Sequence, residues 1–453
     1  MEGSVSPVRT QPKHGLLLGW AEKEKGGFQK PVWAEGEEGH LITVAPTGAG
    51  KGVGCIIPAL LTWRGPAIVI DPKGENYAVT ARRRRDMGQK VHVLDPFGVT
   101  DCIQRASLNP FDMLGPLKQA SYDDMRVLAH AVIQEKVLST KNDPYWDSRA
   151  ASLVTDAIEY CVDHLIKPTL MDVRTVIENY DRYSVCATSF SPAPVASAHH
   201  GILEPFAPLG MGTERTRTSI TSTAMDQLNF ITGGAVANSL FHSTIDLKKV
   251  ERGDPITIYL VLPPNKLFTH AKLLRLWLIT LLGAIGRREA APKLPTLMLV
   301  DEAAQLGEVK EITTAITLMR GYGVKVWTFW QDLTQLAKVY PHDWQSILNN
   351  SAFHQYFGAS TPMAARVLQE YLADTCPRPI TSLKNNQLAL YRPGHKGTVA
   401  RMPNYLTDAM FAGQFDANPF YTSEPELALV DEDYEVHEDK GGVLLHFPAR
   451  EHT

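Results

Sequence analysis

Residues Ala45–Gly54, APTGAGKGVG, decide how the rest of the chain is interpreted, because they nearly match a phosphate-binding loop. The general pattern is G-x-x-x-x-G-K-[ST], and this chain has Ala45 at the first position and Gly52 at the last. An alternating, β-rich run at His40–Ala45 precedes the loop, and a segment with the apolar density of a buried helix follows Lys51. A strand, a glycine-rich loop and a helix in this order predict a nucleotide site.

The expected contacts of this loop follow from its backbone. The N–H groups of residues 47 to 51 would point into a cavity at a helix N-terminus, where oriented dipoles favour phosphate oxygens. Lys51 would reach the β- and γ-phosphates, while Gly48 and Gly50 allow backbone conformations that a side chain would block. The alternative is a glycine-rich turn with a surface lysine. The predicted nucleotide-binding residues are Thr47, Gly48, Ala49, Gly50, Lys51, Gly52 and Val53.

The order of strand and helix signals predicts an α/β fold with a mainly parallel sheet, interrupted by an all-α insertion. Short β-rich runs alternate with helical segments in the first hundred residues, which is typical of crossover units. Strand signals are almost absent between about Tyr122 and Phe230, and buried strands then resume. We therefore predict a nucleotide-binding motor domain in two parts, 1–112 and 243–453, around an all-α domain at 113–242, with an acidic C-terminal tail. The predicted strands are His40–Ala45, Ala67–Asp71, Val91–Asp95, Pro255–Pro263, Thr296–Ala303, Val324–Asp332 and Ala352–Gly358.

Composition limits the possible partners. The net charge of −4 argues against a surface that is basic throughout, so any nucleic-acid contact must come from a local patch such as Arg82–Arg85. The alternative for these four arginines is a solvated helix face. Five scattered cysteines without a C-x-x-C pair suit a reducing compartment and argue against a zinc site. The apolar stretch Leu273–Gly286 is too short to span a bilayer, so the chain as given is expected to be soluble.

Polar residues at the ends of two apolar strands supply the expected chemistry. Asp301 and Glu302 follow the run LMLV; Asp301 would hold Mg²⁺, directly or through water, and Glu302 would orient or deprotonate the attacking water. The alternative is an ordinary strand end before a helix. Gln331 ends the neighbouring strand and could sense the γ-phosphate, or be a satisfied strand-end amide. Arg320, just before that strand, could act in trans on a neighbouring subunit's ATP, or be a surface arginine.

Taken together, these stretches resemble the TraG/TraD-type coupling ATPases of conjugation and type IV secretion, which are related to the FtsK and HerA DNA pumps. The resemblance covers most of the chain, and the combination is far more specific than any single piece. The segments that carry it are HGLLLGW (His14–Trp20), the loop at Ala45–Gly54, PAIVIDPKGENYAVTARRRRDMGQKVHVLDPF (Pro66–Phe97), three helical stretches (Asp143–Val154, Pro168–Arg174, Arg217–Ile231), VDEAAQLG (Val300–Gly307) and WQDLTQL (Trp330–Leu336).

The resemblance implies a RecA-like motor that uses ATP and Mg²⁺, assembles as a homo-hexamer and moves DNA toward a type IV secretion channel. Its implied partners are single-stranded DNA bound without sequence preference, a relaxase or secreted protein cargo, and channel components. A glycine after the loop lysine is a frequent variant in that family, so Gly52 is expected to be tolerated and Mg²⁺ to depend more on Asp301, water and the nucleotide. The first loop position needs only a small residue, which Ala45 satisfies.

Members of the family usually carry transmembrane helices before the motor, whereas this chain begins only about fifteen residues ahead of it. Either an anchor was removed or the protein belongs to a naturally soluble branch of the family. The chain as given is expected in the cytoplasm, and the alternative is association with the cytoplasmic face of the inner membrane. Two other functions compete with the coupling protein. One is a soluble FtsK/HerA-like DNA pump, and the other is a non-hydrolysing adaptor that binds nucleotide and recruits secreted proteins. Arg215 and Arg217 are the alternatives to Arg320 as the residue acting in trans.

Overall fold

The computed structural model of the protein describes residues 15–22, 28–35, 39–133, 144–179, 214–358, 361–372, 379–384 and 386–420. The strands are β1 (Gly15–Glu22), β2 (Phe28–Glu35), β3 (His40–Val44), β4 (Ala67–Ile70), β5 (Lys90–Leu94), β6 (Ile256–Leu260), β7 (Thr296–Val300), β8 (Val324–Trp330), β9 (Ser351–Phe357), β10 (Gln387–Tyr391) and β11 (Thr398–Arg401). They form one 11-stranded sheet in the order β2-β1-β11-β10-β9-β3-β8-β7-β4-β6-β5.

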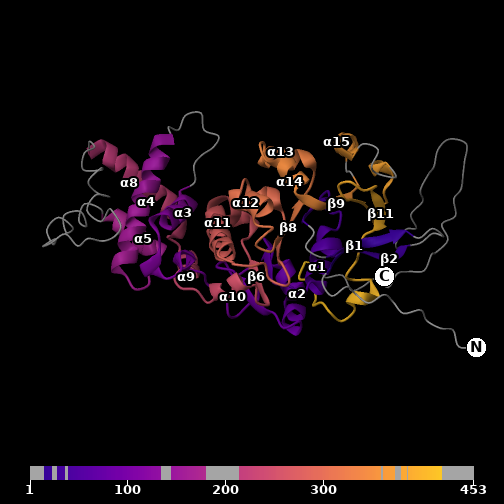
Figure 1. The fold of residues 1–453 in the computed structure, drawn as a ribbon, viewed down its shortest axis with the longest axis horizontal. Helices are drawn as coiled ribbons and strands as arrows, with labels where there is room; N and C mark the ends of the chain where they lie inside the picture. The colour runs from indigo at the N-terminus through magenta and orange to yellow at the C-terminus, as the bar shows by residue number, and fades with distance from the viewer. Residues whose placement is uncertain are drawn as a thin grey trace, which may run out of the picture.

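The helices cover both faces of this sheet and extend beyond one end of it (Figure 1). They are α1 (Ile57–Thr62), α2 (Glu75–Asp86), α3 (Tyr122–Val132), α4 (Pro144–His164), α5 (Leu170–Glu178), α8 (Glu214–Leu228), α9 (Gly234–Ser239), α10 (Leu247–Arg252), α11 (Pro264–Gly286), α12 (Lys310–Leu318), α13 (Leu333–Val339), α14 (Trp344–Asn349) and α15 (Pro362–Leu372).

The strands from β9 to β5 in this order pair in parallel, which confirms the predicted mainly parallel sheet. All seven predicted strands are present, and no end differs from the prediction by more than three residues. Four further strands, β1, β2, β10 and β11, extend the sheet in antiparallel pairing and were not predicted. Pro31 in β2 weakens a strand signal, and it is tolerated there because β2 is the edge of the sheet.

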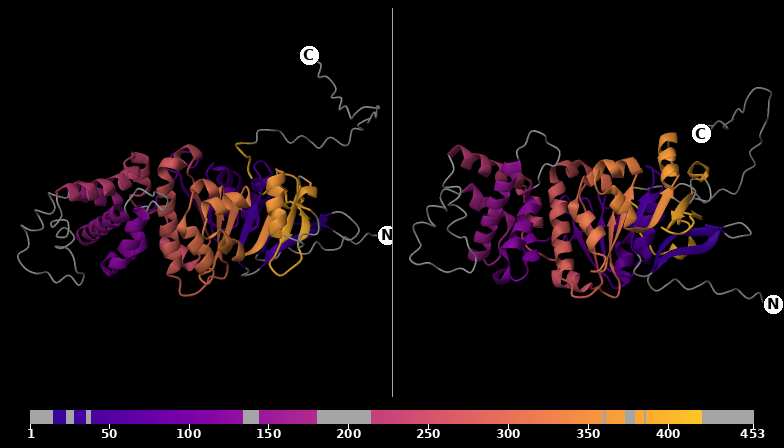
Figure 2. Two further views of the ribbon diagram at one scale, coloured as in Figure 1. Left: turned by 90° about the horizontal axis from the view of Figure 1, so that it is seen from above. Right: turned by 45° about the horizontal axis from the view of Figure 1, so that its top comes forward.

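Alternation along the strands builds a separate apolar layer on each face. Ile68 and Ile70 of β4 join one cluster, which includes α11 and α12, whereas Val69 joins another, which includes α1 and α2. Successive side chains in a strand point to opposite faces, so a fully apolar strand such as AIVI is the expected pattern where helices cover both sides. Figure 2 shows these helices on the two sides of the sheet.

Helices α3, α4, α5 and α8 gather beyond the α11 side of the sheet, at the left of Figure 1. The chain enters and leaves this helical region at adjacent points, because Leu108 N–H donates to Ser239 O over 2.8 Å and Thr244 N–H donates to Ser107 O over 2.9 Å. The apolar residues of the region belong to the same buried cluster as α11. The division of the chain at 113–242 stays a prediction.

Residues 402–418, which we call the covering segment, follow the last strand and run over the loop and α2. Tyr405 N–H donates to Val53 O over 3.4 Å, and Asp416 N–H donates to Val79 O over 3.0 Å. The Met402 side chain lies against Gly50 and Gly54. The covering segment therefore packs against the helical turns that follow the loop lysine and against α2.

Gly54 leaves no room for a side chain because of this contact. A β-carbon at Gly54 would overlap the Met402 side chain and lie 3.0 Å from the Pro403 carbonyl oxygen. We expect Gly54→Ala to lower the free energy of unfolding by about 1–3 kcal/mol, as overpacking of a tight interior does. Thermal and urea denaturation measure the loss.

Two variants test this explanation of the Gly54→Ala effect. Adding Met402→Ala should recover part of the lost stability, because the clash disappears with the long side chain. Gly286→Ala is the matched control, since a β-carbon there meets no atom within 4 Å, and it should unfold like the unmodified protein. Equal melting of Gly54→Ala and Gly286→Ala would contradict the predicted overlap.

Candidate nucleotide site

The loop between β3 and the following helix has the form that the sequence predicts. Ala45 N–H donates to Trp330 O over 2.8 Å, which ties the start of the loop to β8. Gly48 and Gly50 have φ of +77° and +86°, in the left-handed region that favours glycine. A β-carbon at Gly48 would meet no atom within 4 Å, so the loop borders open space at this residue. Residues Gly52–Ile56 then form a π-helical turn that leads into α1.

Lys51 reaches the end of β7, where its Nζ lies 3.7 Å from Glu302 Oε1. Both side chains are mostly buried, at 10% and 24% exposure. Glu302 has φ of +50° and is the only non-glycine residue with positive φ among those that the structure describes. Such backbone costs of order 1–3 kcal/mol and concentrates at functional sites. The structure thus places Lys51 next to Glu302, and in this arrangement the positive charge of the lysine is paired with the negative charge of the carboxylate.

Asp301 precedes Glu302 and accepts a hydrogen bond from the Glu302 N–H over 2.9 Å. The pKa of Asp301 is raised to about 6, mainly by burial and next by the charge of Glu302, while Lys51 acts in the opposite direction. A positive charge near this carboxyl therefore favours its ionised form.

Asp71, to which the motifs assign no role, also lies at this edge of the sheet. The register Ile70↔Val300 places it beside Asp301 at the carboxyl edge of the sheet. It is buried and accepts hydrogen bonds from Tyr77 N over 2.8 Å and Asn76 Nδ2 over 3.3 Å. Burial raises its pKa to about 7, with the charge of Asp301 adding to the effect. The signal that marks Asp301, an apolar strand ending in aspartate, also marks Asp71.

Gln331 lies at the loop, as its position after β8 implies. It lines a cavity of about 250 Å³ together with Pro46 and Thr47 of the loop. Its backbone N–H donates to Gln335 Oε1 over 2.9 Å, so α13 fixes this strand end. A sensor role for the Gln331 amide stays a prediction.

Arg320 lies at the opposite edge of the sheet. It is exposed and lines another cavity, of about 260 Å³, with His40 and Ser351 at the beginnings of β3 and β9. The parallel strand β8 is 7 residues long, which separates the two edges by roughly 23 Å. Arg320 therefore lies too far from its own phosphate loop to act there, and a role in ATP chemistry requires a neighbouring subunit.

The four arginines at 82–85 do not form a uniform basic surface. Arg84 is fully buried and donates to Gly65 O over 2.7 Å and Thr257 Oγ1 over 2.9 Å, and burial lowers its pKa to about 10. Arg82 is exposed but pairs with Asp416 over 2.6 Å. The run therefore includes residues that hold α2 to its neighbours. Neither expectation for these arginines, a basic patch or a solvated helix face, applies to all four of them.

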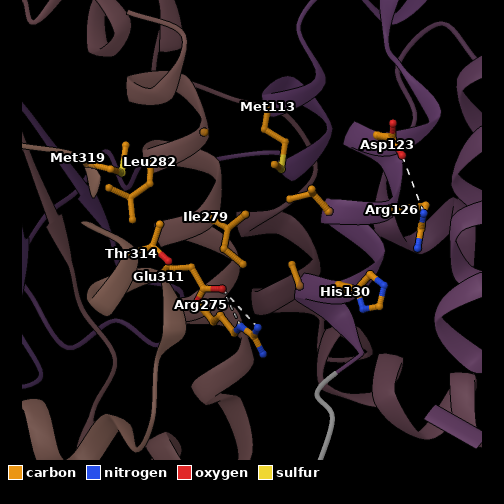
Figure 3. A pocket seen from close by; sticks show the side chains of 13 residues that line it. Met113, Asp123, Arg126, His130, Arg275, Ile279, Leu282, Glu311, Thr314 and Met319 are labelled. Carbon is orange, nitrogen blue, oxygen red and sulfur yellow. Dashed lines mark hydrogen bonds and ion pairs between the residues drawn. The ribbon is translucent and has the colours of Figure 1, made fainter. Parts of the chain in front are cut away.

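A cleft of about 590 Å³ lies away from the loop, between α3 on one side and α11 and α12 on the other (Figure 3). Both of its arginines are paired with carboxylates: Arg275 with Glu311 over 3.3 Å, and Arg126 with Asp123 over 3.9 Å. Its arginines are therefore already paired, and the described residues that line it form no glycine-rich loop with backbone N–H groups for phosphate oxygens.

The described residues contain no group of three or more His, Cys, Asp or Glu side chains arranged to hold a metal ion. The carboxylate of Asp301 is a kind of ligand that Mg²⁺ prefers, and a cation there would not be held by a preformed cluster of such side chains. In the same part of the chain, no helix combines the length and apolar character needed to cross a membrane.

The parallel sheet, the glycine loop and the acidic strand end define a RecA-like P-loop nucleotide-binding fold. The plasmid coupling protein TrwB, solved with ADP and Mg²⁺, has this fold: its TM-score to the chain is 0.64 at 15% identity, over 88% of this chain and 96% of that one. This likeness concerns the fold alone.

The chain belongs to the family described as type IV secretory system conjugative DNA transfer, which matches residues 6–376. Conjugal transfer protein TraG of Escherichia coli is 26% identical over 370 residues, covering 77% of this chain and 56% of that protein. Protein VirD4 of Agrobacterium fabrum is 26% identical over 446 residues, covering 89% of this chain and 64% of that protein. The chain thus spans little more than half the length of the TraG protein that it matches.

Proposed function

We propose that the protein is an ATP-driven coupling protein that recruits DNA or nucleoprotein substrates and translocates them to a type IV secretion channel. The proposal rests on one observation: Lys51, Asp301 and Glu302 lie close together at one edge of a parallel sheet. The chain that carries them belongs to the conjugative DNA transfer family. In this proposal the motor forms a homo-hexameric ring, and the helical region at 113–242 receives a relaxase or another secreted cargo.

We infer ATP and Mg²⁺ as the ligands of the loop, because TrwB, which shares the fold, was solved with ADP and Mg²⁺. Bound Mg²⁺ would neutralise charge on the phosphate oxygens. Lys51 exchanges its contact with Glu302 for the phosphates, which leaves the Glu302 carboxylate free to orient or deprotonate water. Asp301, with its pKa near 6, is mostly ionised at neutral pH and contributes to holding the cation.

Glu302→Gln and Asp301→Asn should separate hydrolysis from nucleotide binding. We expect Glu302→Gln to bind ATP and Mg²⁺ normally and to hydrolyse about 10²–10⁴-fold more slowly, since it removes a general base. Asp301→Asn should weaken the Mg²⁺-dependent binding itself, because it removes a charge that favours the cation. A titration with a fluorescent ATP analogue, with and without Mg²⁺, measures binding, and phosphate release measures turnover.

The control for these two variants is Asp332→Asn at the end of β8. Its side chain accepts from Gln335 N over 2.7 Å as the cap of α13, and we assign it no part in binding the cation. Its nucleotide affinity should keep the Mg²⁺ dependence of the unmodified protein. If Glu302→Gln and Asp301→Asn lose Mg²⁺-dependent binding equally, the assignment of separate roles is wrong.

Steady-state phosphate release with and without single-stranded DNA tests the proposed function. We expect DNA to stimulate hydrolysis and DNA affinity to fall steeply with salt, because a motor that grips many sequences binds the phosphate backbone. The net charge of −4 confines these contacts to a local surface of the ring. Nucleotide binding without hydrolysis, and without salt-dependent DNA binding, would favour the adaptor that recruits secreted proteins.

A further inference from the structure

The carboxylate of Glu75 borders the place where other phosphate loops carry a hydroxyl. A β-carbon built on Gly52 would have one neighbour within 4 Å, Glu75 Oε1 at 3.8 Å. The hydroxyl of a serine or threonine at this position helps to hold Mg²⁺ in P-loop proteins. Glu75 therefore presents an oxygen next to the space that such a hydroxyl would occupy.

A backbone turn and one hydrogen bond fix Glu75 in this position. It is the first residue of α2, after Gly74 with φ of +70°, so its backbone is set by a turn. Its Oε1 accepts a hydrogen bond from Asn418 Nδ2 of the covering segment over 2.7 Å, and Asn418 is itself buried. The carboxylate is therefore oriented before any ligand arrives, as a group that binds a cation with defined geometry has to be.

The surroundings of Glu75 have more negative than positive charge. The carboxyls of Asp71 and Asp301 lie beside it at the strand ends, close enough that the charge of Glu75 opposes ionisation of both. Lys51 brings a positive charge that acts on Asp301, and its Nζ is paired with Glu302. Buried carboxylates without a matching cation are unfavourable unless a positive ion is bound among them.

We propose that Glu75 takes the part of the missing loop hydroxyl and, together with Asp301, receives the divalent cation that arrives with the nucleotide, directly or through one water. This inference rests on the proposed function, because the cation is the Mg²⁺ of the Mg²⁺–nucleotide complex. It explains how a loop with glycine at position 52 keeps a complete cation site: the side chain is supplied by the turn after β4.

The test is the Mg²⁺ dependence of nucleotide binding in the full chain, measured with a fluorescent ADP analogue and varied Mg²⁺. Glu75→Gln keeps the size of the side chain and the acceptor for Asn418. We expect it to lower nucleotide affinity in Mg²⁺ by about 10–100-fold, and to leave the affinity in EDTA unchanged or improved. Mn²⁺ binding in the presence of ADP, followed by electron paramagnetic resonance, should weaken by a similar factor.

A second variant, Gly52→Ser, tests whether a hydroxyl in the loop can replace the carboxylate of Glu75. Its β-carbon fits without a clash, so Gly52→Ser combined with Glu75→Gln should regain most of the Mg²⁺-dependent affinity through the restored hydroxyl. Asn418→Ala is the structural control: it removes the hydrogen bond but keeps the carboxylate, and it should lose less than Glu75→Gln.

Three results would overturn the proposal. The first is unchanged Mg²⁺ dependence in Glu75→Gln. The second is equal loss of affinity with and without Mg²⁺ together with a lowered melting temperature, which would make Glu75 a structural residue. The third is failure of Gly52→Ser to restore any affinity. An unmodified protein that binds no nucleotide at all would instead overturn the proposed function, so the two failures are distinguishable.

Discussion

The Lys51→Ala protein should fold normally and lose its ATP turnover, by at least roughly 10²–10³-fold. The lysine charge acts on the phosphates as charge develops in the transition state, and its ground-state partner in the structure is the single carboxylate of Glu302 at 3.7 Å. Removing the lysine also raises the pKa of Asp301 further, because Lys51 favours the ionised form of that carboxyl. The measurements are phosphate release at saturating ATP and the melting temperature.

Lys338→Ala is the matched control for this substitution. Lys338 is an exposed lysine on α13, so its removal should change neither turnover nor melting. Near-normal hydrolysis by Lys51→Ala, at an unchanged melting temperature, would show that this loop is not the nucleotide site.

The Arg320→Ala protein should lose roughly 10³–10⁵-fold in rate under conditions of assembly, the range associated with arginines that act on a transferring phosphoryl group in trans. Because Arg320 lies at the sheet edge opposite Lys51, its contribution requires a neighbouring subunit. Hydrolysis by the unmodified protein should therefore rise more steeply than in proportion to protein concentration.

Mixing the two inactive proteins gives the sharper test of the trans role. Some interfaces in a mixed ring pair an intact loop with an intact Arg320, so Lys51→Ala and Arg320→Ala together should regain partial turnover. Arg252→Ala is the control, since Arg252 is an exposed arginine shortly before β6 and hence near the same sheet edge. If Arg320→Ala alone turns over ATP normally, Arg215 or Arg217 of α8 becomes the next candidate.

The parallel part of the sheet could be predicted because its strands are short, apolar throughout and separated by helical segments. The antiparallel part could not be predicted in the same way. Strand β1 has the apolar run Leu16–Leu18, but one of its partners, β2, contains Pro31, and the other, β11, is only four residues long and lies almost four hundred residues away. Pairing at such separation leaves no local pattern in either segment.

The location of a residue could be predicted where a local pattern sets it, as for Lys51 after the glycine loop and for Asp301 and Gln331 at strand ends. Residues whose environment is made by distant segments were misjudged. Arg84 belongs to a run that looks solvated, but carbonyl groups after α1 and the Thr257 hydroxyl of β6 satisfy its guanidinium in the interior. The sequence alone did not indicate a role for Glu75, because its carboxylate lies beside Gly52 only in the folded chain.

The covering segment also bears on the order in which the protein is made. The hydrogen bond between Asn418 and Glu75 joins residues 343 positions apart. During synthesis, the phosphate loop is therefore translated long before Asn418. Closing such a loop costs conformational entropy and slows folding, because the contact forms only after most of the chain is ordered. A polypeptide that stopped at residue 376, where the family match ends, would contain Lys51, Asp301 and Glu302 but not Met402 or Asn418. Synthesis must therefore proceed well past the last of the sequence motifs before the covering segment can pack on the phosphate loop and on α2.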